Sequence, residues 1–575
     1  MLNDEQIAAD LACLKEIVAA HKAPEAELAV HEETVDGQLL TVFSKIPGNL
    51  AELYQRALNT PELDFLVYQD ERFTFAQSLD LAKRFARLLI EKYNIGPGDR
   101  VAICARNSPE WCLAYMGTTM IGAIVVPMNS WWKGPELEYG LRDSGAKIIL
   151  ADPARHAQVA PYLEPLGVQL IAIKPEQNNP DIPEFYSSLE KIEALSDAEI
   201  AAFEIKADDD ASIMYTSGST GEPKGVLSSH RGIISSLFTW KFVKEINEEL
   251  RPELKETDPD FKEAILANVP LFHVTGSHAQ FLACFIYQRK FVMMYKWDAG
   301  KALELIQNEK ISVFHGVPTM AWELMHEEKF AETDLSSLRA VQSGGAPRPP
   351  EHLKMMLQKF PERALPGLGY GLTETNAIGA IITGKFYEAR PNSTGRPSPP
   401  VTEVRIEDEE GNVLGANEVG EICIRGPSIM KGYWNKPEET EAVLKDGWFH
   451  TGDVGYLDTL GFLIISDRAK DIVIRGGENI GCAEVEYAIS EHPAVNEVSV
   501  YGIPDERLGE IPAATVMLKT DEQLDQTSLQ EFLGDKVAAF KIPEVIRFQH
   551  DKLPRLGTGK IAKKLLRQET IDSLS

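Results

Sequence analysis

Cysteine is scarce in this chain of 575 residues, and no two cysteines form a C-x-x-C pair. Closely spaced cysteines are typical of zinc sites and of disulfide frameworks, so the sequence indicates neither. Scattered thiols fit a reducing compartment, and we expect a cytoplasmic protein. The cysteines are Cys13, Cys104, Cys112, Cys284, Cys423 and Cys482.

Positive charge is also in short supply. The chain has 58 Lys and Arg against 87 Asp and Glu, which leaves a formal net charge of −29. Such a chain repels a phosphate backbone, and it has no basic stripe to overcome that repulsion. Nucleic acid is therefore not an expected partner.

Long hydrophobic runs are missing as well. The longest apolar stretch, MIGAIVVPM at 120–128, is too short to span a bilayer, so no transmembrane segment is expected. The N-terminus lacks the basic and apolar segments of a secretory signal. Residues 1–49 are expected to form a helical extension. Because its polar positions are acidic, docking onto the body of the protein is favoured over a membrane surface. The apolar positions at helical spacing are Ile7, Leu11, Leu14 and Val18.

The apolar residues that are present, 44% of the chain, suffice for two or more cores. Short apolar runs such as DRVAICA, GAIVVPM and KIILAD alternate with helical patterns, which is typical of parallel α/β layers, and the alternation resumes after ASIMY as a second unit. Closely spaced short strands follow between about 391 and 466, and a mixed pattern follows Asp467. The predicted fold is α/β: a large N-terminal domain of two α/β subdomains plus a β-rich subdomain, and a small C-terminal α+β domain.

One loop has the composition of an anion site. In YTSGSTGEPKGV, residues 215–226, hydroxyls, glycine N–H groups and Lys224 are crowded together after a buried strand and before an expected helix. Such a strand, loop and helix are typical of a phosphate site. The loop lacks the Gly-Lys-Ser/Thr ending of an ordinary P-loop, and composition alone would also fit a flexible linker.

Seven segments, taken together, carry a family resemblance. They are, in order, YTSGSTGEPKGV, VPLFHVTG, GYGLTET, GEICIRG, WFHTGD, DRAKDIVIRGGENI and PRLGTGK. In order and approximate spacing they resemble the core motifs of the adenylate-forming superfamily, and its acyl-CoA synthetases most closely. The resemblance runs from about Leu50 to Arg567. It implies an AMP-binding adenylation domain at 50–469 and a mobile C-terminal lid domain at 470–575.

The resemblance also implies an activity. Such enzymes join a carboxylate to ATP, release pyrophosphate, and pass the acyl group of the acyl-AMP to coenzyme A, with Mg²⁺ as cofactor. Two alternatives stay open: transfer to a carrier protein in trans or to another acceptor, and a catalytically silent sensor of nucleotide or fatty acid. A hydrolase is disfavoured because G-x-S-x-G and H-E-x-x-H are both missing.

The nucleotide-binding residues follow from the resemblance, residue by residue. Tyr370 is expected to stack on adenine, Asp453 to bind ribose and Glu374 to hold Mg²⁺. Lys560 is expected to bridge the carboxylate and the α-phosphate, so it is assigned as catalytic together with Thr373 and His273. The remaining ATP-binding residues are expected to be Thr216, Ser217, Gly218, Ser219, Thr220, Gly221, Lys224, Gly345, Ala346, Pro347, Gly371 and Arg468.

The resemblance also assigns residues to the acid substrate and to coenzyme A. His273 stands where amino-acid-activating relatives commonly carry an aspartate, so a free amino acid is disfavoured and a medium- to long-chain fatty acid is expected. The hinge is assigned to Lys470, and Gly476 and Gly477 are expected to line the path of coenzyme A. A homodimer is also considered. The expected acyl pocket consists of His273, Val274, Gly276, Gly344 and Gly345.

Overall fold

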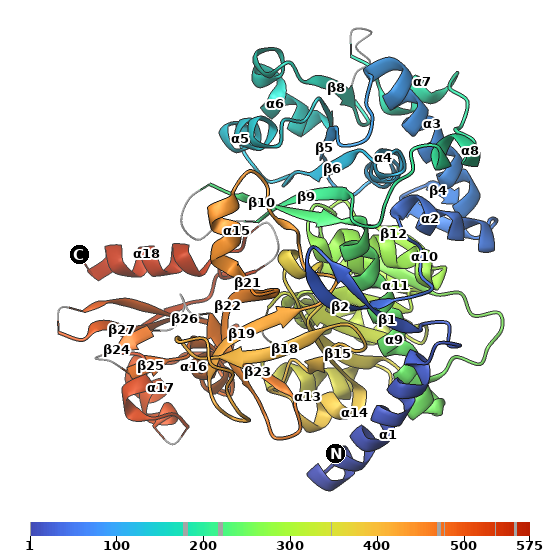
Figure 1. Cartoon of the computed structure of the whole chain (residues 1–575). Coiled ribbons are helices and arrows are strands. Elements are labelled where there is room, and N and C mark those ends of the chain that lie inside the picture. The colour runs from blue at the N-terminus through green and yellow to red at the C-terminus, as the bar shows by residue number, and fades with distance from the viewer. Residues whose placement is uncertain are drawn as a thin grey trace.

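The computed structural model (Figure 1) describes nearly the whole chain. For the residues at 467, 468, 474, 478 and 479 it describes the backbone only. The described ranges are 2–175, 182–216, 222–346, 348–468, 473–475, 478–505, 507–534, 536–556 and 560–574.

The N-terminal residues form a helix and a hairpin. Helix α1 (Asp4–Lys22) begins at a capping box, in which the Asn3 side chain accepts from the Gln6 N–H and the Gln6 side chain accepts from the Asn3 N–H. The helix packs along α9 (His230–Leu250), and Asp10 pairs with Arg251 at the end of α9. Residues 4–22 are therefore helical. Later in the chain, β1 (Val30–Val35) and β2 (Gln38–Phe43) pair antiparallel as a hairpin.

The first sheet has the order β20-β10-β9-β6-β5-β7-β8, and it has the parallel core that the apolar runs predict. β9 and β10 are antiparallel neighbours, and residues 217–221 connect them along the chain. Its strands are β5 (Arg100–Cys104), β6 (Ile124–Pro127), β7 (Ile148–Ala151), β8 (Gln169–Ala172), β9 (Asp210–Thr216), β10 (Lys224–Ser229) and β20 (Gly432–Tyr433). Its helices include α4 (Pro109–Thr119), α5 (Gly134–Ser144) and α6 (Pro153–Leu166).

The second sheet has the order β17-β16-β15-β14-β13-β11-β12-β3-β4. Helix α3 (Phe75–Tyr93) lies against α4 of the first unit, and an aromatic core fills the space between the two sheets. In that core Phe65 stacks on Phe75 at 4.3 Å between ring centroids. The strands are β3 (Asp64–Tyr68), β4 (Glu71–Thr74), β11 (Ala264–Ala267), β12 (Lys290–Met293), β13 (Val313–Gly316), β14 (Ala340–Gly344), β15 (Leu365–Tyr370), β16 (Ala380–Thr383) and β17 (Arg396–Pro397). Helices α11 (Ala299–Asn308), α12 (Pro318–His326) and α13 (Pro350–Lys359) connect them.

Two further sheets complete the chain. The third sheet, β18-β19-β22-β21 with β23 on β22, is the predicted β-rich subdomain: β18 (Glu403–Glu407), β19 (Gly420–Arg425), β21 (Leu444–Lys445), β22 (Trp448–Leu457) and β23 (Leu463–Arg468). The fourth sheet carries helices and is the predicted C-terminal α+β region. It contains β24 (Val473–Arg475), β25 (Glu478–Ile480), β26 (Val495–Asp505), β27 (Gly509–Leu518), β28 (Val545–Gln549), α16 (Cys482–Ser490), α17 (Gln526–Leu533) and α18 (Lys563–Leu574). The predicted architecture is therefore confirmed.

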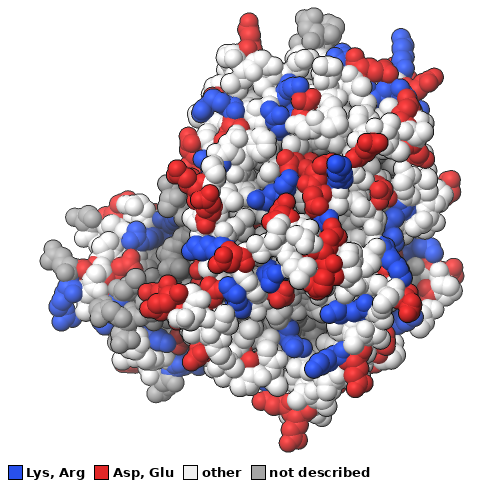
Figure 2. Space-filling model, viewed as in Figure 1, with Lys and Arg blue, Asp and Glu red and all other residues white. Residues whose placement is uncertain are grey.

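Charge is dispersed on the face shown in Figure 2, where Lys and Arg stand among Asp and Glu. Within the part of the chain that the structure describes, no helix is long and apolar enough to cross a membrane.

Candidate active site

The predicted phosphate loop connects two strands, which corrects one expectation. Residues 217–221, which include Ser217, Gly218, Ser219, Thr220 and Gly221, lie outside the described residues. On either side, Thr216 and Lys224 are opposite each other in the β9–β10 register. The segment after the loop is therefore a strand, and the helix begins only at His230. The residues VLSS, 226–229, pair with β9 instead of opening the expected helix.

Lys224 lies close to the ring of Tyr433, whose hydroxyl is bonded to a buried carboxylate. Its ammonium lies 4.9 Å from the centre of the Tyr433 ring and 3.2 Å from an oxygen of Glu439. The Tyr433 hydroxyl donates to Glu374 Oε1 at 3.0 Å, and Glu374 is 9% exposed. Burial, followed by the nearby Glu374 charge, raises the pKa of Tyr433 well above its usual range, so the phenol keeps its proton as a donor. Tyr433 therefore orients the carboxylate predicted to hold Mg²⁺.

Tyr433 is the residue that sequence reasoning missed. It comes from β20, 59 positions after Glu374, and an aromatic residue in the segment MKGYWN has no pattern that identifies such a role. The backbone reinforces the contact, because Met430 N–H donates to the Glu374 carbonyl at 2.8 Å. Thr373 lies beside Glu374 in the short 3₁₀ helix η5 (Thr373–Thr375).

The predicted adenine and ribose residues meet directly. Tyr370 ends β15, and its hydroxyl donates to Asp453 Oδ2 of β22 at 2.6 Å. Asp453 is 5% exposed and is opposite Arg468 in the β22–β23 register, although the Arg468 side chain lies outside the described residues. Gly371 follows Tyr370 and passes so close to Ala377 that an added Cβ would lie 2.4 Å from a backbone carbon. The second and third sheets are therefore joined at these two predicted nucleotide residues.

Lys560, from the C-terminal region, lies beside Gly345. If Gly345 had a Cβ, that atom would lie 3.5 Å from Lys560 Cε and 3.8 Å from Nζ. Gly345 has a φ of +75°, which favours glycine, and it follows Gly344 at the end of β14. Ala346 continues this segment, while Pro347 lies outside the described residues. The structure therefore brings the predicted catalytic lysine onto the predicted adenine segment.

His273 lies in the neighbourhood of this lysine. Burial, and next the positive charge of Lys560, lower the pKa of His273 to about 3, so the imidazole is neutral at neutral pH. Its Nδ1 accepts from the Thr275 N–H at 3.3 Å. Val274 is buried, and Gly276 packs so closely on Pro270 that an added Cβ would lie 2.3 Å from its carbonyl oxygen. Only glycine fits at 276, which lets the chain turn into the π-helix η3 (Thr275–Leu282).

A second buried histidine, His278, connects η3 to the segment that follows Glu374. His278, in η3, is fully buried between Ser277 Oγ at 2.8 Å and Asn376 Oδ1 at 3.1 Å. Asn376 also donates to the Ser428 carbonyl at 2.8 Å. His278 thereby ties η3 to the turn that follows Glu374. The remaining predicted residues, Lys470, Gly476 and Gly477, lie outside the described residues.

The structure brings several of the predicted site residues together, and the comparisons with known proteins identify the family. The AMP-binding enzyme family matches residues 53–434, and its C-terminal domain matches residues 484–560. The chain belongs to this family of AMP-binding enzymes. The predicted adenylate-forming superfamily is thus confirmed.

Individual relatives narrow the class. The long-chain-fatty-acid–CoA ligase FadD13 of Mycobacterium tuberculosis is 34% identical over 90% of this chain and 97% of its own length. The feruloyl-CoA synthase of an Amycolatopsis species is 34% identical over 89% and 97%. Among solved structures, the o-succinylbenzoate coenzyme A synthetase MenE of Bacillus subtilis, in complex with ATP and magnesium ion, is 30% identical over 90% and 99%, with a TM-score of 0.74. The predicted class, an acid–thiol ligase of the acyl-CoA synthetase kind, is confirmed.

Proposed function

We propose that this chain activates a medium- to long-chain fatty acid with ATP and Mg²⁺ and transfers the acyl group to coenzyme A. The observation that supports the proposal most is the position of Lys560 beside Gly345 and in the neighbourhood of His273. In this proposal residues 50–469 form the adenylation domain and residues 470–575 form the lid. A cytoplasmic location and a homodimer remain predictions.

The first half-reaction must bring two anions together. A carboxylate oxygen attacks the α-phosphorus of ATP, the bond to the β-phosphate oxygen breaks, and pyrophosphate leaves. The Lys560 ammonium donates to the oxygens on which negative charge increases, and Lys224 does the same for the departing phosphates. Because His273 is uncharged, it orients the fatty acid carboxylate by hydrogen bonding and leaves Lys560 as the main local cation.

Glu374 suits Mg²⁺, since it is a buried hard oxygen ligand whose orientation is fixed by Tyr433. When bound, Mg²⁺ neutralises phosphate charge in the first step. Asp453 accepts hydrogen bonds from the ribose hydroxyls, and Tyr370 holds both Asp453 and the adenine ring in place.

The second half-reaction passes the acyl group to sulfur. The thiol of coenzyme A attacks the acyl carbonyl carbon, AMP leaves with the electrons of the broken bond, and the thiol proton is released. Two observations support the choice of acid. FadD13 and a Bacillus subtilis relative are named as long-chain ligases, and small or apolar residues flank His273 in the sequence.

The test is pyrophosphate release with Mg²⁺ and ATP across acetate, octanoate, palmitate, benzoate and ferulate, with and without coenzyme A. We expect release with octanoate or palmitate, and a thioester only when coenzyme A is present. Preference for ferulate would move the acid to the aryl class. Release without thioester would favour a carrier protein, and no release with any acid would favour the silent sensor.

A further inference from the structure

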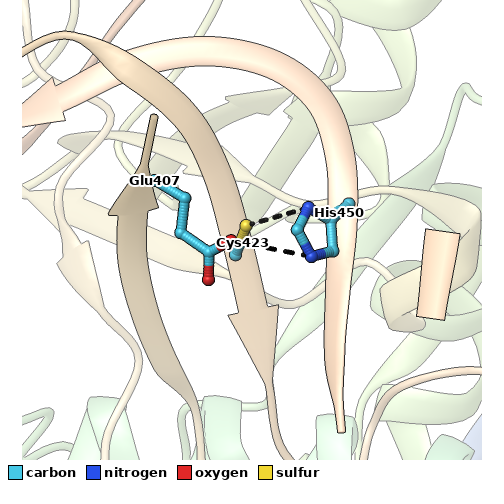
Figure 3. A group of neighbouring side chains, drawn as sticks. All are labelled: Glu407, Cys423 and His450. Carbon is cyan, nitrogen blue, oxygen red and sulfur yellow. Dashed lines mark hydrogen bonds and ion pairs between the residues drawn. The ribbon is translucent and has the colours of Figure 1, made fainter. Parts of the chain in front are cut away.

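Three strands of the third sheet bring together side chains that no predicted role uses. Glu407 ends β18, Cys423 lies in β19 and His450 lies in β22 (Figure 3). Cys423 is directly opposite His450 in the β19–β22 register. Glu407 is opposite Glu421, two residues before Cys423, so strand alternation puts the carboxylates, the thiol and the imidazole on one face.

The thiol and the imidazole of this cluster are spaced like two ligands of one tetrahedral metal ion. One ligand atom from each of Glu407, Cys423 and His450 lies within 4.8 Å of the others. The Cys423 Sγ to His450 Nδ1 distance is 3.5 Å. Zinc bond lengths of about 2.3 Å to sulfur and about 2.05 Å to nitrogen, at a tetrahedral angle, place those atoms about 3.6 Å apart. The thiol and the imidazole are therefore spaced for one shared ion without a change of the backbone.

Glu407 supplies the carboxylate of this set, and Glu421 lies outside it. The Glu407 Oε2 atom lies 3.8 Å from His450 Nε2, while Glu421 Oε2 lies 3.0 Å from His450 Nδ1 as a partner of the ring. The other Glu407 oxygen pairs with Arg405, whose guanidinium stacks 4.0 Å from the Trp448 ring centre. Arg405 thereby fixes the carboxylate through one oxygen while the second faces His450, which is how outer partners usually orient a metal ligand.

Burial and charge favour a cation at this position. Cys423 is fully buried, and the Glu407 and His450 side chains are 4% and 11% exposed. The carboxylates of Glu407 and Glu421 supply negative charge around the thiol, and binding of a divalent ion would release the thiol proton to solvent.

We propose that Cys423, His450 and Glu407 bind one divalent transition-metal ion of the zinc class. Thiolate and imidazole ligands select such an ion over Mg²⁺ or Ca²⁺, so this site is separate in chemistry from the one at Glu374. The cysteine spacing could not indicate it, because the ligands converge only through strand register.

The ion would fix the strand that carries the ribose carboxylate. Asp453 follows His450 by three positions in β22, and the Gly452 N–H between them donates to Glu421 Oε1 at 2.9 Å. A metal that joins β18, β19 and β22 would hold this stretch rigid. We therefore expect a higher melting temperature for the metal-bound protein.

The experiment uses the full chain, stripped with a chelator and titrated with Co²⁺ in excess Mg²⁺. We expect one Co²⁺ per chain, with a thiolate-to-cobalt charge-transfer band that Zn²⁺ abolishes. Cys423→Ser should remove the band, while Cys13→Ser, at an exposed free thiol, should retain it. Glu407→Gln should retain the thiolate band and raise the Co²⁺ dissociation constant by about tenfold or more.

Several outcomes would overturn the proposal. One is the absence of a saturable charge-transfer band in the wild-type chain, which would leave the cluster as a hydrogen-bonded network. Another is a band that persists in Cys423→Ser. If Cys423→Ser fails to fold by circular dichroism, the Glu407→Gln titration decides, and an unchanged dissociation constant would count against the site.

Discussion

Removing the Tyr433 hydroxyl should weaken the Mg²⁺ dependence of the first half-reaction in a measurable way. The Tyr433→Phe change keeps the ring that packs over Lys224 and deletes the 3.0 Å hydrogen bond to Glu374. A hydrogen bond to a charged group contributes about 1.5–3 kcal/mol, and loss of an outer partner typically lowers metal affinity about 10–100-fold. Because Glu374 is 9% exposed, water replaces that donor poorly.

The assay is the initial rate of pyrophosphate release against Mg²⁺ concentration, at saturating ATP and palmitate. We expect the half-saturating Mg²⁺ concentration of Tyr433→Phe to rise about tenfold or more. Thioester formation from preformed acyl-AMP should stay unchanged. Tyr295→Phe, at a half-exposed tyrosine, is the matched control. An identical Mg²⁺ response of Tyr433→Phe and the control would contradict this role of the Tyr433 hydroxyl.

Three further predictions follow from other parts of the structure. Lys560→Ala should slow adenylation about 10²–10³-fold, as expected for a lost electrostatic donor, and spare thioester formation from acyl-AMP; equal loss in both half-reactions would contradict its role. His278 is fully buried, and burial lowers its pKa to about 4. The folded state therefore resists protonation, so this contribution to stability is intact above about pH 6.5 and is lost as the pH falls towards 4. His278→Gln should flatten the fall in melting temperature over that range relative to the wild type, while His31→Gln, at an exposed histidine, should not. Ile7→Ala should cost about 2–5 kcal/mol of unfolding free energy in chemical denaturation, because Ile7 is fully buried against Tyr387 and Phe462; a cost near zero would mean that α1 does not stabilise the body.

The sequence was informative where local patterns decide structure. Buried runs such as KIILAD became β7, and the ordered motifs led to Tyr370 and Asp453, which prove to be hydrogen-bonded across 83 positions of the chain. Local composition failed at VLSS, residues 226–229, where pairing with β9 outweighed the expected helix, which begins at His230. It also could not reveal Tyr433, since only the fold of β20 beside β10 brings that ring to Glu374.

The predicted roles of the site residues remain predictions, and the reason is physical. A role depends on where a bound nucleotide lies, which neither motif order nor side-chain contact determines. The structure adds that Lys560, Gly345 and His273, which are far apart in the sequence, lie near one another in the fold.

The docking of α1 has a consequence for how the protein is made. Ile7 packs in a cluster whose other members include Leu353, Tyr387 and Phe462, and α1 lies along α9, which begins at His230. At about 5–20 residues per second, synthesis of the intervening chain takes on the order of ten seconds or more before even α9 exists. During that time the apolar side chains of α1, Ile7 and Ile17 among them, have no native partner, so the nascent chain exposes them to a ribosome-associated chaperone.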